Sequence, residues 1–225
     1  ERFSTFIPPL TQTAAIEVTA IHSVAGTISQ RALLSSAPPF IAPHHSTTIV
    51  AMVGGGSRTI RPGACSLAHR GVLFIDEAPE CASGILDSLR QPLESGVASI
   101  SRSSGMVTFP AKFILILAAN PCPCGRFAGR GRACECSSLQ VRRYLNRLSG
   151  PLLDRIDIQI RVEPPTRAAM SEGNKEESSR VIQERVLAAR SRSHERFKSY
   201  PFSLNSDIPS ELLRTEFRAE KIAME

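Results

Sequence analysis

The chain has 225 residues, and 42% of them are apolar, which is enough to bury the core of one large domain or of one domain and part of another. Its formal net charge of +6 and its pI near 9.3 favour polyanionic partners: a nucleotide, a nucleic acid or an acidic surface. No run of 18 apolar residues and no signal-like segment is present, so we expect no membrane partner. Six cysteines then indicate a reducing, cytoplasmic compartment in which thiols stay free or bind metal.

The first fifty residues predict helices and loops. Residues 1–7 have a helical pattern that stops at Pro8, and without an initiator Met we expect a piece that starts inside a helix. A second helix is expected to run to about Val24, with Thr11 or Thr13 as its cap and Gly26 as its end.

Residues 35–71 are rich in loop signals. The run 54–58 (GGGSR) lacks the Gly-x-x-x-x-Gly-Lys-Ser/Thr spacing of a phosphate-binding loop, so we do not assign it that role. A mobile, solvated loop that carries Arg58 and Arg61 is one interpretation, and a DNA contact is the other. For His44 and His45 a structural or nucleotide-proximal role is favoured over metal binding.

Two adjacent carboxylates follow a short apolar run. Residues 72–75 (VLFI) predict a buried central strand that ends in Asp76 and Glu77. In open α/β sheets ligands bind at such strand ends. Asp76 can hold Mg²⁺, and Glu77 can orient and polarise an attacking water. The alternative is an ordinary core strand followed by an acidic pair at a helix N-terminus.

The next segments predict a helix, a hairpin and a second buried strand. Residues 85–93 have helical spacing, and 97–101 and 106–109 flank a glycine turn with Arg102 at its tip. Arg102 is either a solvated turn residue or a DNA contact. Residues 113–119 form an apolar run that ends in Asn120, whose amide can hydrogen-bond a water or a γ-phosphate or can simply begin a turn.

Two Cys-x-Cys pairs come next. Cys122, Cys124, Cys134 and Cys136 flank a glycine-rich loop, and four thiolates this close can hold a tetrahedral Zn²⁺. The usual knuckle spacing is Cys-x-x-Cys, so reduced free thiols and a disulfide stay open as alternatives. Six arginines make this the most basic region, which is either a path for a phosphate backbone or a solvated face: Arg126, Arg130, Arg132, Arg142, Arg143 and Arg147.

The last third predicts helices around one strand. Ser138 is the expected cap of a helix to about Leu148, and 158–162 alternate like a strand. Arg155 is either a local ion-pair partner of Asp154 or Asp157 or an arginine finger for a neighbouring subunit. A charged amphipathic helix is expected over 176–197, and Pro209 begins a last helix.

Longer motifs carry a family resemblance over about residues 1 to 200. In chain order they are 22–26 (HSVAG), 42–45 (APHH), 66–71 (SLAHRG), 74–77 (FIDE), 89–94 (LRQPLE), 108–111 (TFPA), 119–125 (ANPCPCG) and 148–157 (LSGPLLDRID). Their sequence and order closely resemble the ComM/YifB branch of the magnesium-chelatase-like AAA+ ATPases.

This resemblance implies an α/β fold: an AAA+ P-loop-type ATPase core with a parallel sheet over residues 1–165, and a partial C-terminal helical lid over 166–225. It implies ATP and Mg²⁺ as cofactors and a homohexameric ring with ATP hydrolysed between subunits. Asp76 and Glu77 resemble the Walker B acids, Asn120 resembles sensor 1, and Arg155 resembles the arginine finger.

The resemblance also implies two pore devices. Residues 54–71, with Arg58 and Arg61, resemble the insert in the second helix, and 98–109, with Arg102, resemble the hairpin before sensor 1. In related ring helicases both point toward DNA.

Two departures from the family pattern concern the ATP site. The phosphate-binding loop and the late arginine used as sensor 2 are absent from these residues, so we expect an internal piece that is inactive alone. Two functions stay open for the intact protein. One is a DNA motor for branch migration or translocation, and the other is a chelatase-like or chaperone-like motor that remodels a protein or inserts a metal.

Overall fold

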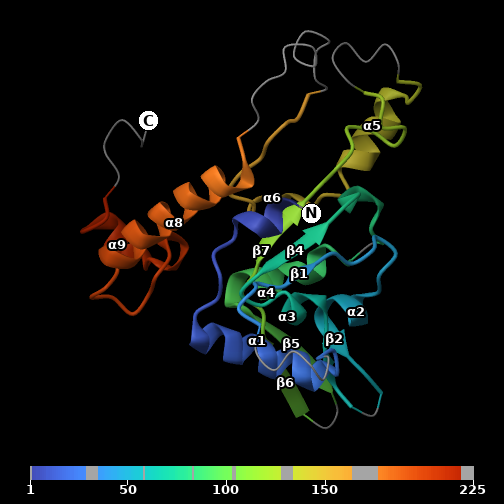
Figure 1. The fold of residues 1–225 in the computed structure, drawn as a ribbon. Coiled ribbons are helices and arrows are strands. Elements are labelled where there is room, and N and C mark those ends of the chain that lie inside the picture. Colours follow the sequence, from blue (N-terminus) through green and yellow to red (C-terminus); the bar gives the residue numbers. More distant parts are fainter. Residues whose placement is uncertain are drawn as a thin grey trace. The chain divides into compact units, whose positions relative to one another are not determined.

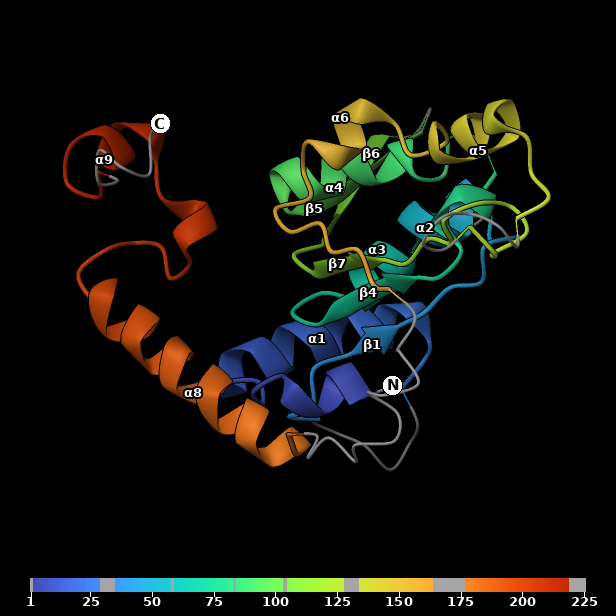
Figure 2. The same ribbon diagram turned by 90° about the horizontal axis from the view of Figure 1, so that it is seen from above.

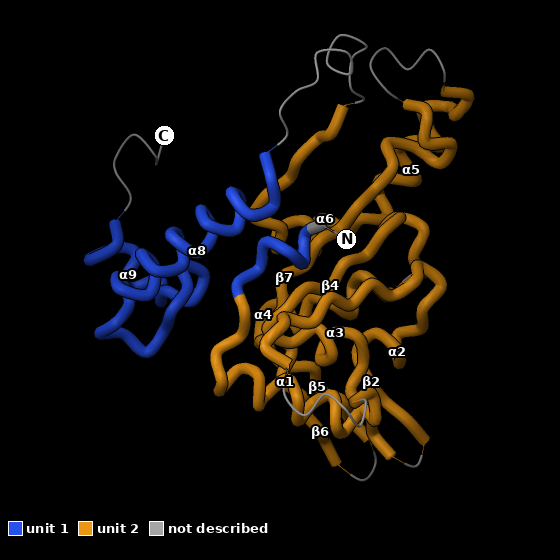
Figure 3. Tube along the Cα trace, viewed as in Figure 1, with its two compact units in different colours: residues 1–8, 176–225 blue, residues 9–175 orange. Residues whose placement is uncertain are grey.

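The computed structural model describes residues 2–28, 35–57, 59–82, 84–102, 105–127, 134–163 and 177–218. The chain divides into two compact units (Figure 3): Glu1–Pro8 with Glu176–Glu225, and Pro9–Lys175. The expected boundary between core and lid, at residues 165 and 166, lies outside the described residues and stays a prediction.

The larger unit is built on a parallel three-stranded sheet with the order β1-β4-β7 (Figure 1). Its strands are β1 (Phe40–Ile41), β4 (Val72–Ile75) and β7 (Ile114–Leu117). Figure 2 shows β4 between its two neighbours. Three of the four β4 side chains are buried, as expected for an apolar run that is covered on both faces. The predicted α/β class with a parallel sheet is therefore confirmed.

Helix α1 (Gln12–Ala25) begins and ends where its caps predict. The side chain of Thr11 accepts a hydrogen bond from the backbone N–H of Ala14, and Gly26 ends the helix in the left-handed conformation, with φ 74°. Its buried side chains are Ala15, Val18 and Ile21. Two shorter helices, α2 (Ile49–Val53) and α3 (Ala64–Leu67), lie between β1 and β4 in sequence.

The glycine run forms a hairpin rather than an irregular loop. Strand β2 (Gly54–Gly55) pairs antiparallel with β3 (Arg61–Pro62). A Cβ at Gly54 would lie 2.8 Å from both the Arg61 carbonyl oxygen and Ile100 Cδ1, so only glycine allows this close approach to the partner strand and to the Ile100 side chain.

The hairpin that the sequence predicts, with strands at 97–101 and 106–109, is confirmed. Strand β5 (Val97–Arg102) pairs antiparallel with β6 (Gly105–Pro110). It follows three short helical segments: η2 (Ala78–Glu80), η3 (Asp87–Leu89) and α4 (Arg90–Ser95). Both hairpins lie at the end of this unit opposite to the arrowheads of β4 and β7 (Figure 1).

In the core of the larger unit, side chains of β4 pack against side chains of α2, α3 and the helical segments that follow β4. Its largest fully buried apolar side chains include Met52, Leu73, Ile75, Ile85, Leu89 and Leu152. Burying such a side chain stabilises the fold by roughly 1.5–3 kcal/mol. Leu73 and Ile75 belong to β4, so their burial holds this strand in the core.

The segment after the cysteines corrects two predictions. Helix α5 (Ser138–Leu145) is capped by Ser137, in a capping box with Gln140, one residue before the expected cap. After α6 (Gly150–Leu153), residues 158–162 form no strand, and their apolar side chains are 74–87% exposed. An alternating run forms a strand only where another strand supplies hydrogen-bonding partners. No described strand pairs with this run.

The smaller unit is helical. It contains η1 (Arg2–Phe6), α8 (Ser179–Arg196), η4 (Asn205–Asp207) and α9 (Ser210–Arg214). Four aromatic rings cluster after α8: Phe197, Tyr200, Phe202 and Phe217. In the described part of the chain, no helix has both the length and the apolar character that crossing a membrane requires.

Candidate active site

Strands β4 and β7 end side by side, which brings the predicted polar residues to one edge of the sheet. Ile75 is the partner of Leu117, and the Ala118 N–H donates to the Ile75 carbonyl at 2.9 Å. The chain turns back at once, because the Ala78 N–H donates to the Ala118 carbonyl at 2.9 Å. Asp76 and Glu77 therefore lie in the turn next to the chain that leads to Asn120, as their positions in the sequence predict.

Glu77 has a strained backbone. Its φ of 50° and ψ of 40° lie in the left-handed region, which costs a residue with a Cβ roughly 1–2 kcal/mol. Its N–H donates to Asp76 Oδ1 at 2.8 Å, and its carbonyl accepts from the Glu80 N–H at 2.7 Å. The turn after β4 thus keeps the Glu77 side chain in an unusual, fixed direction, a feature that clusters at functional sites.

His45 contacts the Glu77 carboxylate. Its Nδ1 lies 3.0 Å from Glu77 Oε2, and both side chains are partly exposed. This contact is an ion pair when the imidazole is protonated. The His44 ring lies 4.0 Å from the His45 ring, centroid to centroid. Sequence reasoning left His45 without a partner, although β1 is parallel to β4 and the loop after β1 must reach the same edge.

Asp76 has a different environment. Its side chain is exposed, and among the described residues no cationic side chain pairs with it. Carboxylate oxygens are the ligands that Mg²⁺ takes from proteins, so the exposed Asp76 beside Glu77 fits the metal that the sequence predicts.

Side chains in and just after helix α5 support the turn that follows β4. Arg147, just after the helix, donates through Nη1 to the Pro79 carbonyl at 2.9 Å and to Glu80 Oε2 at 3.3 Å. Tyr144 is buried, and burial first, then the nearby charges of Glu80 and Glu77, raise its pKa. Neither residue was assigned to the site from sequence, where the arginine counted only as part of a basic stretch.

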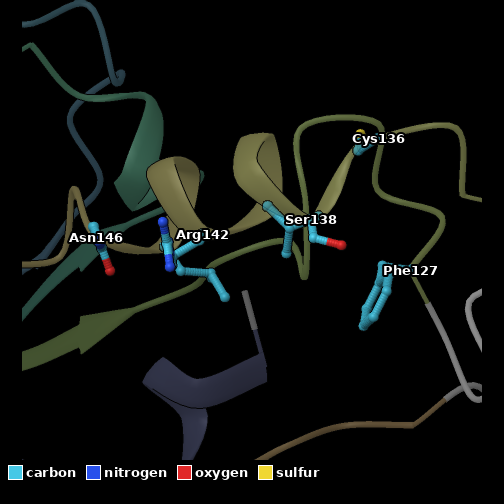
Figure 4. A pocket seen from close by; sticks show the side chains of 7 residues that line it. Phe127, Cys136, Ser138, Arg142 and Asn146 are labelled. Atoms are coloured by element: carbon cyan, nitrogen blue, oxygen red, sulfur yellow. The ribbon is translucent and has the colours of Figure 1, made fainter.

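The four predicted cysteines come together just after Asn120. Their sulfurs all lie within 4.8 Å of one another, and all four thiols are free: Cys122, Cys124, Cys134 and Cys136. A shallow pocket lies beside them along α5, with Phe127 and Arg142 among its lining residues (Figure 4). The two remaining cysteines are buried elsewhere, and burial raises the pKa of Cys65 to about 12.

The predicted arginines do not join the carboxylates. Arg155 forms an ion pair with Glu94 of α4 rather than with Asp154 or Asp157. Arg61 on β3 and Arg102 at the end of β5 are exposed on the two hairpins, away from the strand ends (Figure 1). Arg58 lies outside the described residues.

Comparison with known proteins gives a consistent answer. The family model described as "Magnesium chelatase, subunit ChlI" matches residues 1–170. An uncharacterized protein of Mycobacterium tuberculosis is 45% identical over 224 residues, which is 100% of this chain and 44% of that protein. YifB of Salmonella typhimurium, also uncharacterized, is 44% identical over 200 residues, or 88% of this chain and 38% of YifB.

A third relative has a functional name. Competence protein ComM of Haemophilus influenzae is 42% identical over 212 residues, or 91% of this chain and 40% of ComM. The chain thus spans less than half the length of the curated relatives it matches. It belongs to the magnesium-chelatase-like family of AAA+ proteins, in the group that includes ComM and YifB.

Proposed function

We propose that the full-length protein hydrolyses ATP and uses the energy to act on DNA, by translocation or branch migration, as a cytoplasmic homohexameric ring. The observation that carries this proposal is the convergence of Asp76, Glu77 and the chain to Asn120 at neighbouring strand ends. Ligands bind at the carboxyl ends of parallel strands, and this family is of AAA+ type.

Each strand-end residue has a separate role in the proposed hydrolysis. Asp76 would hold the Mg²⁺ that accompanies ATP, an ion that neutralises charge on the phosphate oxygens when it is bound. Glu77 orients the attacking water and polarises it as a general base. Asn120 donates its amide hydrogens to the water or to the γ-phosphate.

His45 is the positioning residue in this scheme. Its contact with Glu77 Oε2 supports the strained turn from the β1 side. A carboxylate has two oxygens and about four lone pairs, so this contact leaves acceptor positions for the attacking water. His45 would therefore orient Glu77 without blocking its action as a base.

DNA is the favoured substrate for two reasons. The basic side chains Arg61 and Arg102 are exposed on two neighbouring hairpins, where side chains can follow a phosphate backbone. The H. influenzae relative is named a competence protein, and competence is the uptake of DNA. Arg58 completes the proposed set of contacts.

The alternative is a motor that remodels a protein or inserts a metal, because the matching family model is described as a chelatase subunit. A steep salt dependence separates the two, since each phosphate contact adds roughly 0.9 to the slope of log affinity against log salt for duplex DNA.

The test is ATP hydrolysis by the full-length protein with and without duplex and branched DNA, together with DNA affinity over a range of salt. We expect DNA to stimulate hydrolysis and the affinity to fall steeply with salt. Hydrolysis that DNA leaves unchanged, with no salt-dependent binding, would favour the chelatase-like or chaperone-like motor.

A further inference from the structure

We propose that Cys122, Cys124, Cys134 and Cys136 bind one Zn²⁺ through four thiolates, and that this ion anchors the end of β7 and with it Asn120. The metal-binding part of the proposal stands on the cluster itself, whether or not the strand-end carboxylates hydrolyse ATP.

The sulfur positions match a tetrahedral site. A zinc ion with Zn–S bonds of about 2.3 Å has its sulfur ligands about 3.8 Å apart. Here the Sγ atoms of Cys122 and Cys124 lie 3.3 Å apart, and each lies 3.6 Å from Sγ of Cys134. With Cys136 included, no two sulfurs are more than 4.8 Å apart. The three shorter sulfur–sulfur distances need to lengthen by a few tenths of an ångström, and any distance near 4.8 Å needs to shorten, to give a regular tetrahedron.

The arrangement does not suit a disulfide. A disulfide brings two sulfurs to about 2.05 Å and excludes a third from the bond. Three of these sulfurs form a nearly equal triangle, so no pair is singled out. Four ligands converging on one point are what a metal ion requires, and four soft sulfur donors select zinc or iron over Mg²⁺.

The two halves of the cluster are also linked through charged side chains. The Arg126 and Glu135 side chains, one from each half of the cluster, are 3.8 Å apart.

The cluster is joined to both sides of the candidate active site. Cys122 is fully buried and lies two residues after Asn120, in a turn closed by the Gly125 N–H to its carbonyl at 3.0 Å. Cys136 directly precedes Ser137, the cap of α5, and α5 carries Tyr144. A bound ion therefore ties the chain after β7 to the helix that supports the turn after Glu77.

The first experiment measures metal and thiols in the full-length protein, purified without chelator. We expect about one zinc and no iron per chain, and Co²⁺ substitution should give the visible absorption of tetrahedral thiolate cobalt. After denaturation with chelator under non-reducing conditions, all six cysteines of these 225 residues should react with a thiol reagent. A metal-free protein overturns the site, and so does bound iron or the loss of two of these thiols to a disulfide.

Matched variants test the anchoring. Cys124→Ser removes an exposed ligand, and Cys81→Ala removes a buried cysteine outside the cluster. We expect Cys124→Ser to lose the metal and to show faster hydrogen exchange at 118–125 and in α5, whereas Cys81→Ala keeps its zinc and its protection there. A zinc-free Cys124→Ser protein with normal exchange at both segments overturns the anchoring role.

Discussion

The two ends of β4 carry the same chemical pair in different surroundings. At the start of the strand His69 Nε2 lies 3.1 Å from Glu17 Oε2, and at its end His45 Nδ1 lies 3.0 Å from Glu77 Oε2. His69 is 3% exposed, and its Nδ1 accepts the Lys112 N–H at 3.1 Å, so both ring nitrogens are satisfied.

The pair at the end of the strand is partly exposed, and its glutamate has a strained backbone. A Glu–His contact is therefore no sign of a site by itself. Two features distinguish the candidate site. Both of its side chains are open to solvent, whereas His69 is buried, and its strained residue is the glutamate itself, whereas the left-handed residue at the start of β4 is the neighbouring Arg70.

The largest effect is expected at an arginine outside both pairs. Arg155→Ala should lower ATP turnover by about 10³ or more if its guanidinium stabilises charge on a neighbouring subunit's γ-phosphate. Mixing it with Glu77→Gln should restore some activity, because some interfaces then combine an intact carboxylate with an intact arginine.

The contact of Arg155 with Glu94 supplies the control. If Arg155 only holds Glu94 within its own chain, Glu94→Gln should lose as much activity as Arg155→Ala, and mixtures should stay inactive although they assemble. We expect Glu94→Gln to remain active, since it frees the guanidinium instead of removing it.

The pair of buried His69 with partly exposed Glu17 should control stability and its dependence on pH. Burial lowers the pKa of His69, and the Arg70 hydrogen bond lowers the pKa of Glu17. The His69 contribution to the free energy of unfolding is complete above about pH 6.5 and is lost as pH falls toward its lower folded pKa, because there the unfolded chain binds a proton that the folded chain does not. The Glu17 contribution has the same sign and is lost below about pH 4.5.

His69→Gln tests this network by urea unfolding. Glutamine keeps a donor for Glu17 but leaves the Lys112 N–H without its acceptor, which should cost about 1–3 kcal/mol at neutral pH and flatten the stability profile below pH 6.5. A variant with unchanged stability and the wild-type pH profile would mean that the contact of His69 with Glu17 is not structural.

The exposed arginines of the hairpins should give the smallest effect. Arg61→Ala and Arg102→Ala should each reduce the salt slope of DNA binding by about 0.9 without changing hydrolysis in the absence of DNA. Arg180→Ala is a matched control, since Arg180 is an exposed arginine on α8 that pairs with Glu184. Equal losses in all three variants would indicate only a general charge effect.

The sequence predicts those parts of the fold that depend on local signals. An apolar run buried on both faces identifies β4, and glycine and cap residues set the ends of α1 and the hairpin of β5 and β6. The alignment of the ends of β4 and β7, which places Asp76 beside the chain that leads to Asn120, follows from the rule that parallel strands end together.

The rest depends on partners that a local pattern does not reveal. Strand β1 has only two residues, too few for a recognisable pattern, and so the contact of His45 with Glu77 was missed. Residues 158–162 have the pattern of a strand but no partner among the described strands. Arg155 has two acids beside it in sequence, yet α4 brings a third one to its guanidinium.

The most direct test replaces the glutamate of each Glu–His contact, Glu77 or Glu17, by glutamine and measures steady-state ATP hydrolysis by the full-length protein. Glu77→Gln should lose turnover by about 10²-fold or more while ATP binding and the urea midpoint stay unchanged, because an amide keeps the shape but cannot act as a base. Glu17→Gln should hydrolyse ATP normally and unfold at lower urea. Near-normal hydrolysis by Glu77→Gln would contradict the assignment of the end of β4 as the catalytic site.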